Sequence, residues 1–477
     1  MRSLLIIAFT LTVSTATFAA PTFNKDIAPI MFDHCASCHR AGEIAPFPLL
    51  TYADVKKRAK LIVDVTEDRF MPPWHAEKGY GQFHGERRLT DAQIALIKQW
   101  VEGGMLEGDA KDLPPQPKFT DGWQLGEPDL VVKMSEVFEV PAEGRDVYRA
   151  FVLPLGLTED KYVRAVEFRP GNRRVTHHAL LFLDDSGKAR ELDKNDPGPG
   201  YKSFGGPGFT PTGGLGGWAP GNQPTELPQG VARVIKKGSD LVVQMHFHPT
   251  GKVEKEQSTI GIYFTKKPPE KLLVGFALLN RQLDIPPGEK HYAVTDEFIL
   301  PIDAQIIGLT PHAHLLGKTM KAWATKPDGT VVPMIHIKRW NFDWQEQYLY
   351  DQPLHLPKGT KIEMVFTYDN STANPSNPSS PPKRVRWGEQ TTDEMAILFV
   401  SAVPERMTDL ALLRGASAGK MAKSFSSDPE AIKEMVQKQL ISRFDKNGNG
   451  VLDADERREA LKAIREQVQE RRENKNE

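Results

Sequence analysis

Cysteine is nearly absent from this chain, with only 2 cysteines among 477 residues, Cys35 and Cys38. No cysteine therefore remains for a disulfide anywhere else, and a zinc knuckle at this pair would lack a third cysteine ligand. An excess of charge of one sign is also lacking, since the formal net charge at pH 7 is −1. There is no basic stripe, and this argues against nucleic acid as a partner.

Long hydrophobic runs are lacking beyond the N-terminus, so we expect no membrane span. Residues 1–20 have the pattern of a secretory signal peptide: Arg2, a short apolar core over residues 4–13, and mostly small residues up to Ala20. The apolar core is too short to cross a bilayer. We therefore expect an exported bacterial protein that is periplasmic or secreted.

Both cysteines belong to one motif, Cys35-Ala-Ser-Cys38-His39, the attachment signature of a c-type haem. Each thiol would form a thioether to a haem vinyl group, and His39 would ligate the iron. A redox cysteine pair and half a zinc site are the alternatives, and the export signal favours haem. The sequence thus predicts one covalent haem c.

Residues 22–105 resemble class I cytochrome c in outline, a small all-α domain with the haem motif early and a closing helix late. Thr90 and Gln93 have the spacing of a capping box, and apolar residues follow at positions 94, 97, 100 and 101. We predict Met71 as the sixth iron ligand because the prolines after it stiffen its loop. Competing ligands are His75, His84, Met31 and Met105. Residues 106–122 read as a linker.

From residue 123 to residue 406, short β-branched and aromatic runs alternate with Gly, Pro, Asn and Asp. This pattern predicts two antiparallel β-sandwich, jelly-roll-like domains, over residues 123–270 and 271–406. Three histidine clusters fall on or beside the expected strands. Residues i and i+2 of a strand share a face, whereas adjacent residues share one only at a strand end or bulge. The clusters are His177-His178, His246-Phe-His248 and His312-Ala-His314.

Residues 125–405 resemble the copper type II, ascorbate-dependent monooxygenases, the family of peptidylglycine and dopamine β-monooxygenases. In that family an adjacent histidine pair and a later histidine in a Q-x-H-aromatic context bind one copper. An H-x-H pair and a distant methionine in a D-E-M context bind the other, across a solvent-filled cleft. The matching residues here are His177, His178 and His246 for the first copper, and His312, His314 and Met395 for the second.

The resemblance implies that the copper of His312, His314 and Met395 uses O2 to hydroxylate a small organic substrate. The all-histidine copper and the haem would deliver electrons from a periplasmic donor. Thr310 and Phe399 stand where peptidylglycine monooxygenase has an arginine and a tyrosine that bind its peptide, so an uncharged or apolar substrate is expected instead.

Two further features depart from the family. Its animal members are rich in disulfides, whereas this stretch contains no cysteine. His248 has no counterpart, and we interpret it as a plain strand residue, with an extra ligand or a ligand-supporting group as the alternatives. The competing hypothesis for the whole chain is an electron-transfer or copper-binding protein without an organic substrate. For a three-histidine site taken alone, zinc is the alternative metal.

The C-terminal segment, residues 425–470, contains one twelve-residue loop of the EF-hand type, with Gly450 at the sharp turn. The pattern predicts one calcium ion, and a polar surface turn that binds nothing is the alternative. Helices are expected on both sides of the loop. The predicted ligands are Asp445, Asn447, Asn449, Val451 through its carbonyl, Asp453 and Glu456.

Overall fold

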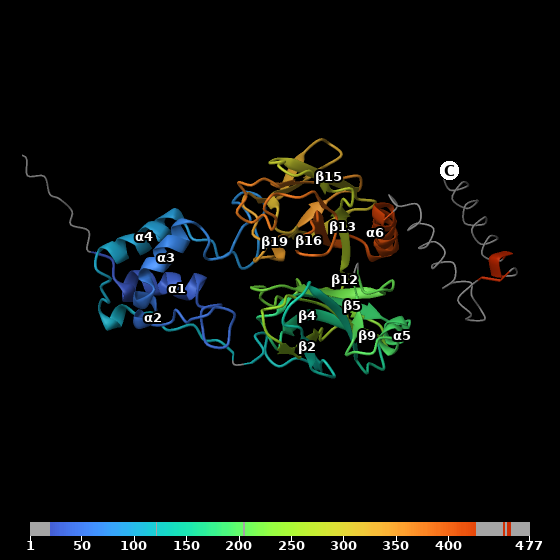
Figure 1. Ribbon diagram of the computed structural model, residues 1–477, viewed down its shortest axis with the longest axis horizontal. Coiled ribbons are helices and arrows are strands. Elements are labelled where there is room, and N and C mark those ends of the chain that lie inside the picture. The colour runs from blue at the N-terminus through green and yellow to red at the C-terminus, as the bar shows by residue number, and fades with distance from the viewer. Residues whose placement is uncertain (1–19, 121, 204–205, 426–451, 454–455, 459–477) are drawn as a thin grey trace, which may run out of the picture. The chain divides into compact units, whose positions relative to one another are not determined.

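The computed structural model describes residues 20–120, 122–203, 206–425, 452–453 and 456–458 (Figure 1). The chain divides into two compact units, one of residues 1–74 and 85–120 and one of residues 75–84 and 121–477. Apart from Ala20, the predicted signal peptide lies outside the described residues. Within the described part of the chain, no helix is both long enough and apolar enough to cross a membrane.

All regular elements described in the first unit are helices, which pack on a core that includes Phe23, Ile97 and Trp100. The predicted capping box is confirmed: Thr90 Oγ1 accepts a hydrogen bond from the backbone N–H of Gln93, and the Gln93 side chain accepts one from the backbone N–H of Thr90. The helices are η1 (Phe23–Ile27), α1 (Ala28–His34), α2 (Tyr52–Lys57), α3 (Ala59–Glu67), α4 (Asp91–Glu102) and η2 (Ala110–Asp112).

The start of the expected linker is bound to this helical unit. The carbonyl of Leu106 accepts from the backbone N–H of Phe23 at 2.8 Å and from the indole N–H of Trp100 at 2.9 Å. Asn24 donates from its side chain to the carbonyls of Gly108 and Asp109. Residues 106–109 therefore belong structurally to the helical unit.

In the second unit, residues 130–272 form two five-stranded sheets in the orders β1-β11-β4-β8-β12 and β6-β3-β9-β5-β7, with β2 and β10 as a separate pair. One apolar core draws residues from both large sheets. The elements are β1 (Leu130–Lys133), β2 (Phe138–Val140), β3 (Val147–Pro154), β4 (Lys161–Arg169), β5 (Thr176–Asp184), α5 (Lys188–Lys194), β6 (Tyr201–Lys202), β7 (Gly213–Trp218), β8 (Val231–Ile235), β9 (Asp240–Phe247), β10 (Glu254–Glu256), β11 (Thr259–Phe264) and β12 (Lys271–Leu272).

Residues 274–404 form two four-stranded sheets, β13-β22-β16-β19 and β15-β20-β17-β18, with β14 paired to β21. Phe276 on β13 stacks on Phe298 of β15 at 4.3 Å between ring centroids, so these two sheets face each other. The elements are β13 (Val274–Leu279), β14 (Asp284–Ile285), β15 (Tyr292–Ile299), β16 (Ala304–His312), β17 (Gly317–Thr325), β18 (Val331–Ile337), β19 (Tyr348–Leu356), β20 (Lys361–Tyr368), β21 (Val385–Arg386), β22 (Ile397–Pro404), η3 (Met407–Asp409) and α6 (Leu410–Phe425).

Among the described strands of the second unit, pairing is antiparallel apart from the short β8–β12 pair. On β20, residues facing the core alternate with half-buried ones, as expected for a strand covered on one face. By contrast, all eight residues of β9 are buried, so its polar Gln244 and His246 need partners inside the protein. The prediction of a mostly antiparallel β protein with a smaller helical part is confirmed.

Candidate metal centre

The first predicted copper site lies where β5 pairs with β9. The register shifts between Thr176, which faces Phe247, and His178, which faces His246. This irregularity at His177 is the bulge that an adjacent histidine pair needs to turn both rings to one side. One ring nitrogen from each of His177, His178 and His246 lies within 4.8 Å of the others, so a single ion could bind all three.

The electrostatics of this triad suit a metal. Burial first, and then the neighbouring His246, lower the pKa of His177 to about 3. Burial likewise lowers the pKa of His178 and of His246, so all three are neutral at pH 7, the form in which imidazole binds metals. The buried Nε2 of His177 has no hydrogen-bond partner. Because buried polar atoms normally have a partner, a bound metal ion would satisfy this one.

His246 is held on both sides of its ring. Tyr148 on β3 stacks on it at 4.2 Å between ring centroids, and the Asp146 carboxylate lies 3.2 Å from its Nε2. A carboxylate at one ring nitrogen leaves the lone pair of a neutral imidazole on the other. That other atom, Nδ1, is 3.4 Å from Nδ1 of His178, where a shared cation would join the two.

The second predicted site starts at the end of β16. His312 is the last residue of that strand, and its Nδ1 donates to Oε1 of Gln345 at 2.5 Å. Gln345 is itself oriented by a bond from its Nε2 to the carbonyl of Phe342. His314 donates from Nδ1 to the carbonyl of Asp393 at 3.1 Å. Both rings therefore keep the Nε2 lone pair for a metal.

Glu394 joins the H-x-H turn to the predicted methionine ligand. Its carboxylate is fully buried and accepts from the backbone N–H groups of His314, of Leu316 at 2.9 Å and of Met395 at 2.8 Å. Burial raises the pKa of Glu394 to about 8, against the effect of these hydrogen bonds. Met395 is 9% exposed and packs in an apolar cluster with Trp387. Its role as a copper ligand stays a prediction.

The two sets of histidines lie next to each other rather than across a wide cleft. The ring centroids of His178 and His312 are 6.4 Å apart. Phe342 stacks on His177 at 4.5 Å and meets His314 edge-on at 5.7 Å. Burial lowers the pKa of His312 to about 4 and that of His314 well below the ordinary value. Five neutral imidazoles thus form one cluster.

The haem motif lies directly after α1 in the first unit. The backbone N–H of His39 donates to the carbonyl of Cys35, and its Nδ1 donates to the carbonyl of Phe47 at 3.1 Å. Nε2 of His39 is therefore free for iron, as an axial histidine requires. Burial, and then the proximity of Cys38, raise the pKa of Cys35 to about 12. These residues fit a covalent haem.

The predicted sixth iron ligand and its competitors lie in different parts of the fold. Met71 follows α3, is half-buried, and donates from its backbone N–H to the carbonyl of Val65. Of the competitors, Met31 is fully buried in the helical core and Met105 packs against that core. His75 and His84 fall in the second compact unit.

Most of the predicted calcium loop lies outside the described residues: Asp445, Asn447, Asn449 and Val451. Asp453 and Glu456 are described and bond to each other, backbone N–H to carboxylate in both directions, at 2.9 and 3.0 Å. This reciprocal pattern is typical of a helix start. Calcium binding stays a prediction.

Several residues of the centre were missed by sequence reasoning because no ligand motif contains them. They include a carboxylate, two aromatic rings and an amide that contact the histidines: Asp146, Tyr148, Phe342 and Gln345. His248, interpreted as a plain strand residue, lies one position beyond β9, and its Nδ1 is 2.7 Å from Oδ1 of Asp146. Glu394 was also missed, although it did carry a signal, since it stands inside the D-E-M motif.

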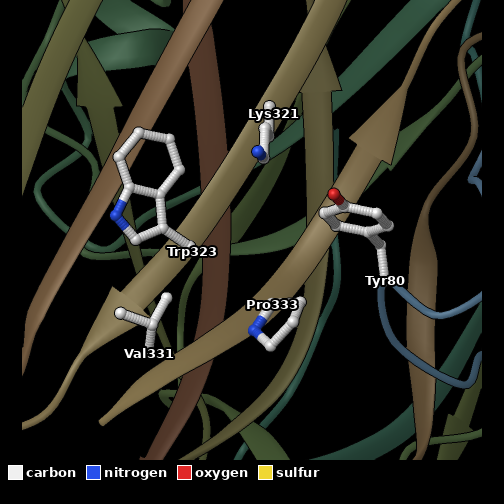
Figure 2. Close-up of a pocket in the computed structure, with 5 residues that line it drawn as sticks. All are labelled: Tyr80, Lys321, Trp323, Val331 and Pro333. Carbon is white, nitrogen blue, oxygen red and sulfur yellow. The ribbon is translucent and has the colours of Figure 1, made fainter.

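A separate shallow pocket of about 300 Å³ lies on β17 and β18 (Figure 2). It is lined by Tyr80 from the segment 75–84 and by Lys321, Trp323, Val331 and Pro333. That segment pairs with the sheets of the second unit through Ala76–Ile337 and Phe83–Tyr350 bridges. The pocket lining includes no histidine, cysteine or carboxylate, so it offers no metal ligand.

Comparison with known proteins assigns no family. No family model matches the chain, and no curated protein does. Among solved structures, the major capsid protein P2 from bacteriophage PM2 is 7% identical and PNGF-II is 10% identical, each with a TM-score of 0.25. They match 58% and 67% of this chain and 97% and 70% of their own. The VP2 subviral particle protein of infectious bursal disease virus is 7% identical, with a TM-score of 0.18, over 63% of this chain and 76% of its own. Likeness at this level carries no functional argument.

Proposed function

We propose that this chain is an exported copper- and haem-containing monooxygenase that hydroxylates a small, uncharged organic substrate. The observation that carries the proposal is the cluster of two histidine sets, with the rings of His178 and His312 at 6.4 Å. Two redox metals in such a cluster could together store the two electrons that insertion of one oxygen atom into a C–H bond consumes, with two protons and O2. Copper bound by imidazoles and a thioether supplies this chemistry through its Cu(I) and Cu(II) states.

Within the proposal, His177, His178 and His246 hold the electron-storing copper, and His312, His314 and Met395 hold the copper that meets O2. Gln345 and the Asp393 carbonyl keep Nδ1 of the second pair protonated and so leave Nε2 for the metal. Zinc would satisfy three histidines equally well but could not accept an electron, which would leave the fused haem without a purpose.

The register of β16 and β22 supports the proposed type of substrate. On β16 and β22, His312 faces Ile397 and Thr310 faces Phe399. Directly opposed residues of an antiparallel pair point to one face, so Phe399 lies on the face of His312, about 7 Å along the strand. Its side chain is 41% exposed. An exposed aromatic ring and an uncharged threonine favour an apolar or uncharged substrate.

The remaining parts of the proposal follow the motifs of the chain. His39, with Cys35 and Cys38, would hold the haem that accepts electrons from a periplasmic donor, and Met71 would be its sixth ligand. The two groups of facing sheets would be the jelly-roll-like copper domains. The C-terminal loop from Asp445 to Glu456 would bind one calcium ion.

Metal analysis of the full chain, matured with haem and loaded with copper, tests the proposal first. We expect two coppers per haem iron, and His178→Ala and His312→Ala should each remove one. Reaction with ¹⁸O₂ and a panel of small uncharged substrates should then give a product carrying one ¹⁸O atom, and Met395→Ala should abolish it. Bound zinc in place of copper, or full hydroxylation by Met395→Ala, would refute the assignment.

A further inference from the structure

Asp146 contacts His246 of the first proposed metal site and Thr391 of the turn that precedes Met395 of the second. It precedes β3, and its side chain is only 6% exposed. Its Oδ2 is 3.2 Å from Nε2 of His246, and its Oδ1 is 2.7 Å from Nδ1 of His248. The same carboxylate accepts hydrogen bonds from the backbone N–H of Thr391, at 3.2 Å, and from the Thr391 hydroxyl.

Thr391 belongs to the turn that leads to the other site. Within this turn, Gln390 and Asp393 bond to each other, backbone to backbone at 2.8 Å. The carbonyl of Asp393 accepts from the His314 ring, and Glu394 follows directly and binds the backbone of His314 and Met395. A path of contacts therefore runs from His246 to Asp146 and Thr391, and from there through the backbone of the turn to the Asp393 carbonyl and Glu394, which bind the ligands of the second site.

A second contact supports the same turn. Tyr148, two residues after Asp146, donates from its hydroxyl to the carbonyl of Glu389 while its ring stacks on His246. The link between the sites thus depends on Asp146, just before β3, and Tyr148, on β3, which bond to Thr391 and Glu389 of the turn. A carboxylate that accepts from a hydroxyl, a backbone N–H and the His248 imidazole, and that lies 3.2 Å from Nε2 of His246, is held in one orientation, because each bond to a charged group is stronger than a neutral one.

We propose that Asp146 and Thr391 are positioning residues that couple copper binding at the two sites. Copper on His246 would fix that ring, the ring fixes the carboxylate, and the carboxylate holds the turn in the form that presents His314 and Met395. By reciprocity, copper at the second site would tighten the first. The inference rests on the two metal sites of the proposed function and is independent of its oxygen chemistry.

The test is competition of the full, haem-matured chain with a chromogenic Cu(I) chelator under anaerobic, reducing conditions. The affinity of the first site is measured with the second site filled and again with the second site removed by His312→Ala. The ratio of these two affinities is the coupling factor. We expect it to be about tenfold or more, the effect of one hydrogen bond to a charged group.

Thr391→Val keeps the shape of the side chain but removes the hydroxyl donor, so the coupling factor should fall toward one. The first-site affinity measured with His312→Ala should not change, which shows that the variant is folded. Thr391→Ser restores a hydroxyl and should restore the coupling, and Thr392→Val, at the exposed neighbouring position, should leave it intact.

The inference would be overturned if Thr391→Val left the coupling factor unchanged, or if the wild-type factor were one. In either case, a protein that still bound two coppers would leave the proposed function intact. A chain that binds no copper at either site would overturn the proposed function itself.

Discussion

Glu394 offers the sharpest test of how the second site is built, because one buried carboxylate holds three backbone groups. Oε1 accepts from the N–H groups of His314 and Met395, and Oε2 accepts from that of Leu316. Replacement by glutamine keeps one acceptor oxygen and the size of the side chain. Replacement by alanine removes both oxygens and leaves a small cavity.

The magnitudes follow from the groups left without a partner. In Glu394→Gln the amide oxygen can keep the bonds to His314 and Met395, but the amide nitrogen then faces the N–H of Leu316. One buried N–H without an acceptor costs about 1–3 kcal/mol. In Glu394→Ala three such groups lose their acceptor, and the simple sum is roughly 3–9 kcal/mol. That is comparable with the whole stability of a domain, about 5–15 kcal/mol.

Denaturant unfolding of the copper-free protein, at a pH above the Glu394 pKa of about 8 so that the carboxylate is ionised, measures these free energies, and Cu(I) competition measures the second site. We expect Glu394→Gln to be less stable by 1–3 kcal/mol, as estimated above, with Cu(I) affinity within tenfold of wild type, and Glu394→Ala to lose both stability and Cu(I) binding. Glu297→Gln, on the exposed face of β15 beside Lys361, should change stability by less than about 1 kcal/mol. An alanine variant as stable as the glutamine variant would refute the account.

Three further outcomes are expected. The folded-state pKa of His312, about 4, lies below the unfolded value of 6.5, so its stabilising contribution is present above pH 6.5 and is lost as pH falls toward 4. The copper-free protein should thus lose up to about 3 kcal/mol from this group, seen as a lower denaturant midpoint. Asp146→Asn should weaken copper at the first site about 10–100-fold in chelator competition, because it removes the carboxylate partner of a ligand imidazole. Phe399→Ala should raise KM for apolar substrates about five- to thirtyfold, from about 1–2 kcal/mol of lost apolar contact, with the copper content unchanged.

Local features were predictable because they depend on neighbouring residues. The capping box at Thr90 and Gln93 needs only a three-residue spacing, and it forms as expected. The haem motif likewise lies within five residues, and the ring of His39 is oriented by Phe47, only eight positions further on. The β-branched and aromatic run of β20 is of the kind that predicts a strand, and every second residue of it is buried.

The bulge at His177 could not be predicted from the neighbouring residues alone. The sequence showed that two adjacent histidines need a strand end or a bulge to face one ion. The register shift between β5 and β9 supplies it, and that shift depends on how residues about 70 positions apart pair. Backbone register is a property of the whole sheet, so no local pattern could specify it.

By itself, then, the sequence determined the chemical types that are available: two thiols beside a histidine, three histidine clusters, a D-E-M motif and a calcium-type loop. Only the tertiary structure decided that two of the histidine sets join in one cluster, that Asp146 connects His246 with Thr391, and that Glu394 binds the backbone of both His314 and Met395. The physical reason is the sequence distance over which each property is determined. Ligand identity is set by single residues, whereas burial, tautomer and the distance between sites are set by contacts between strands far apart in the chain.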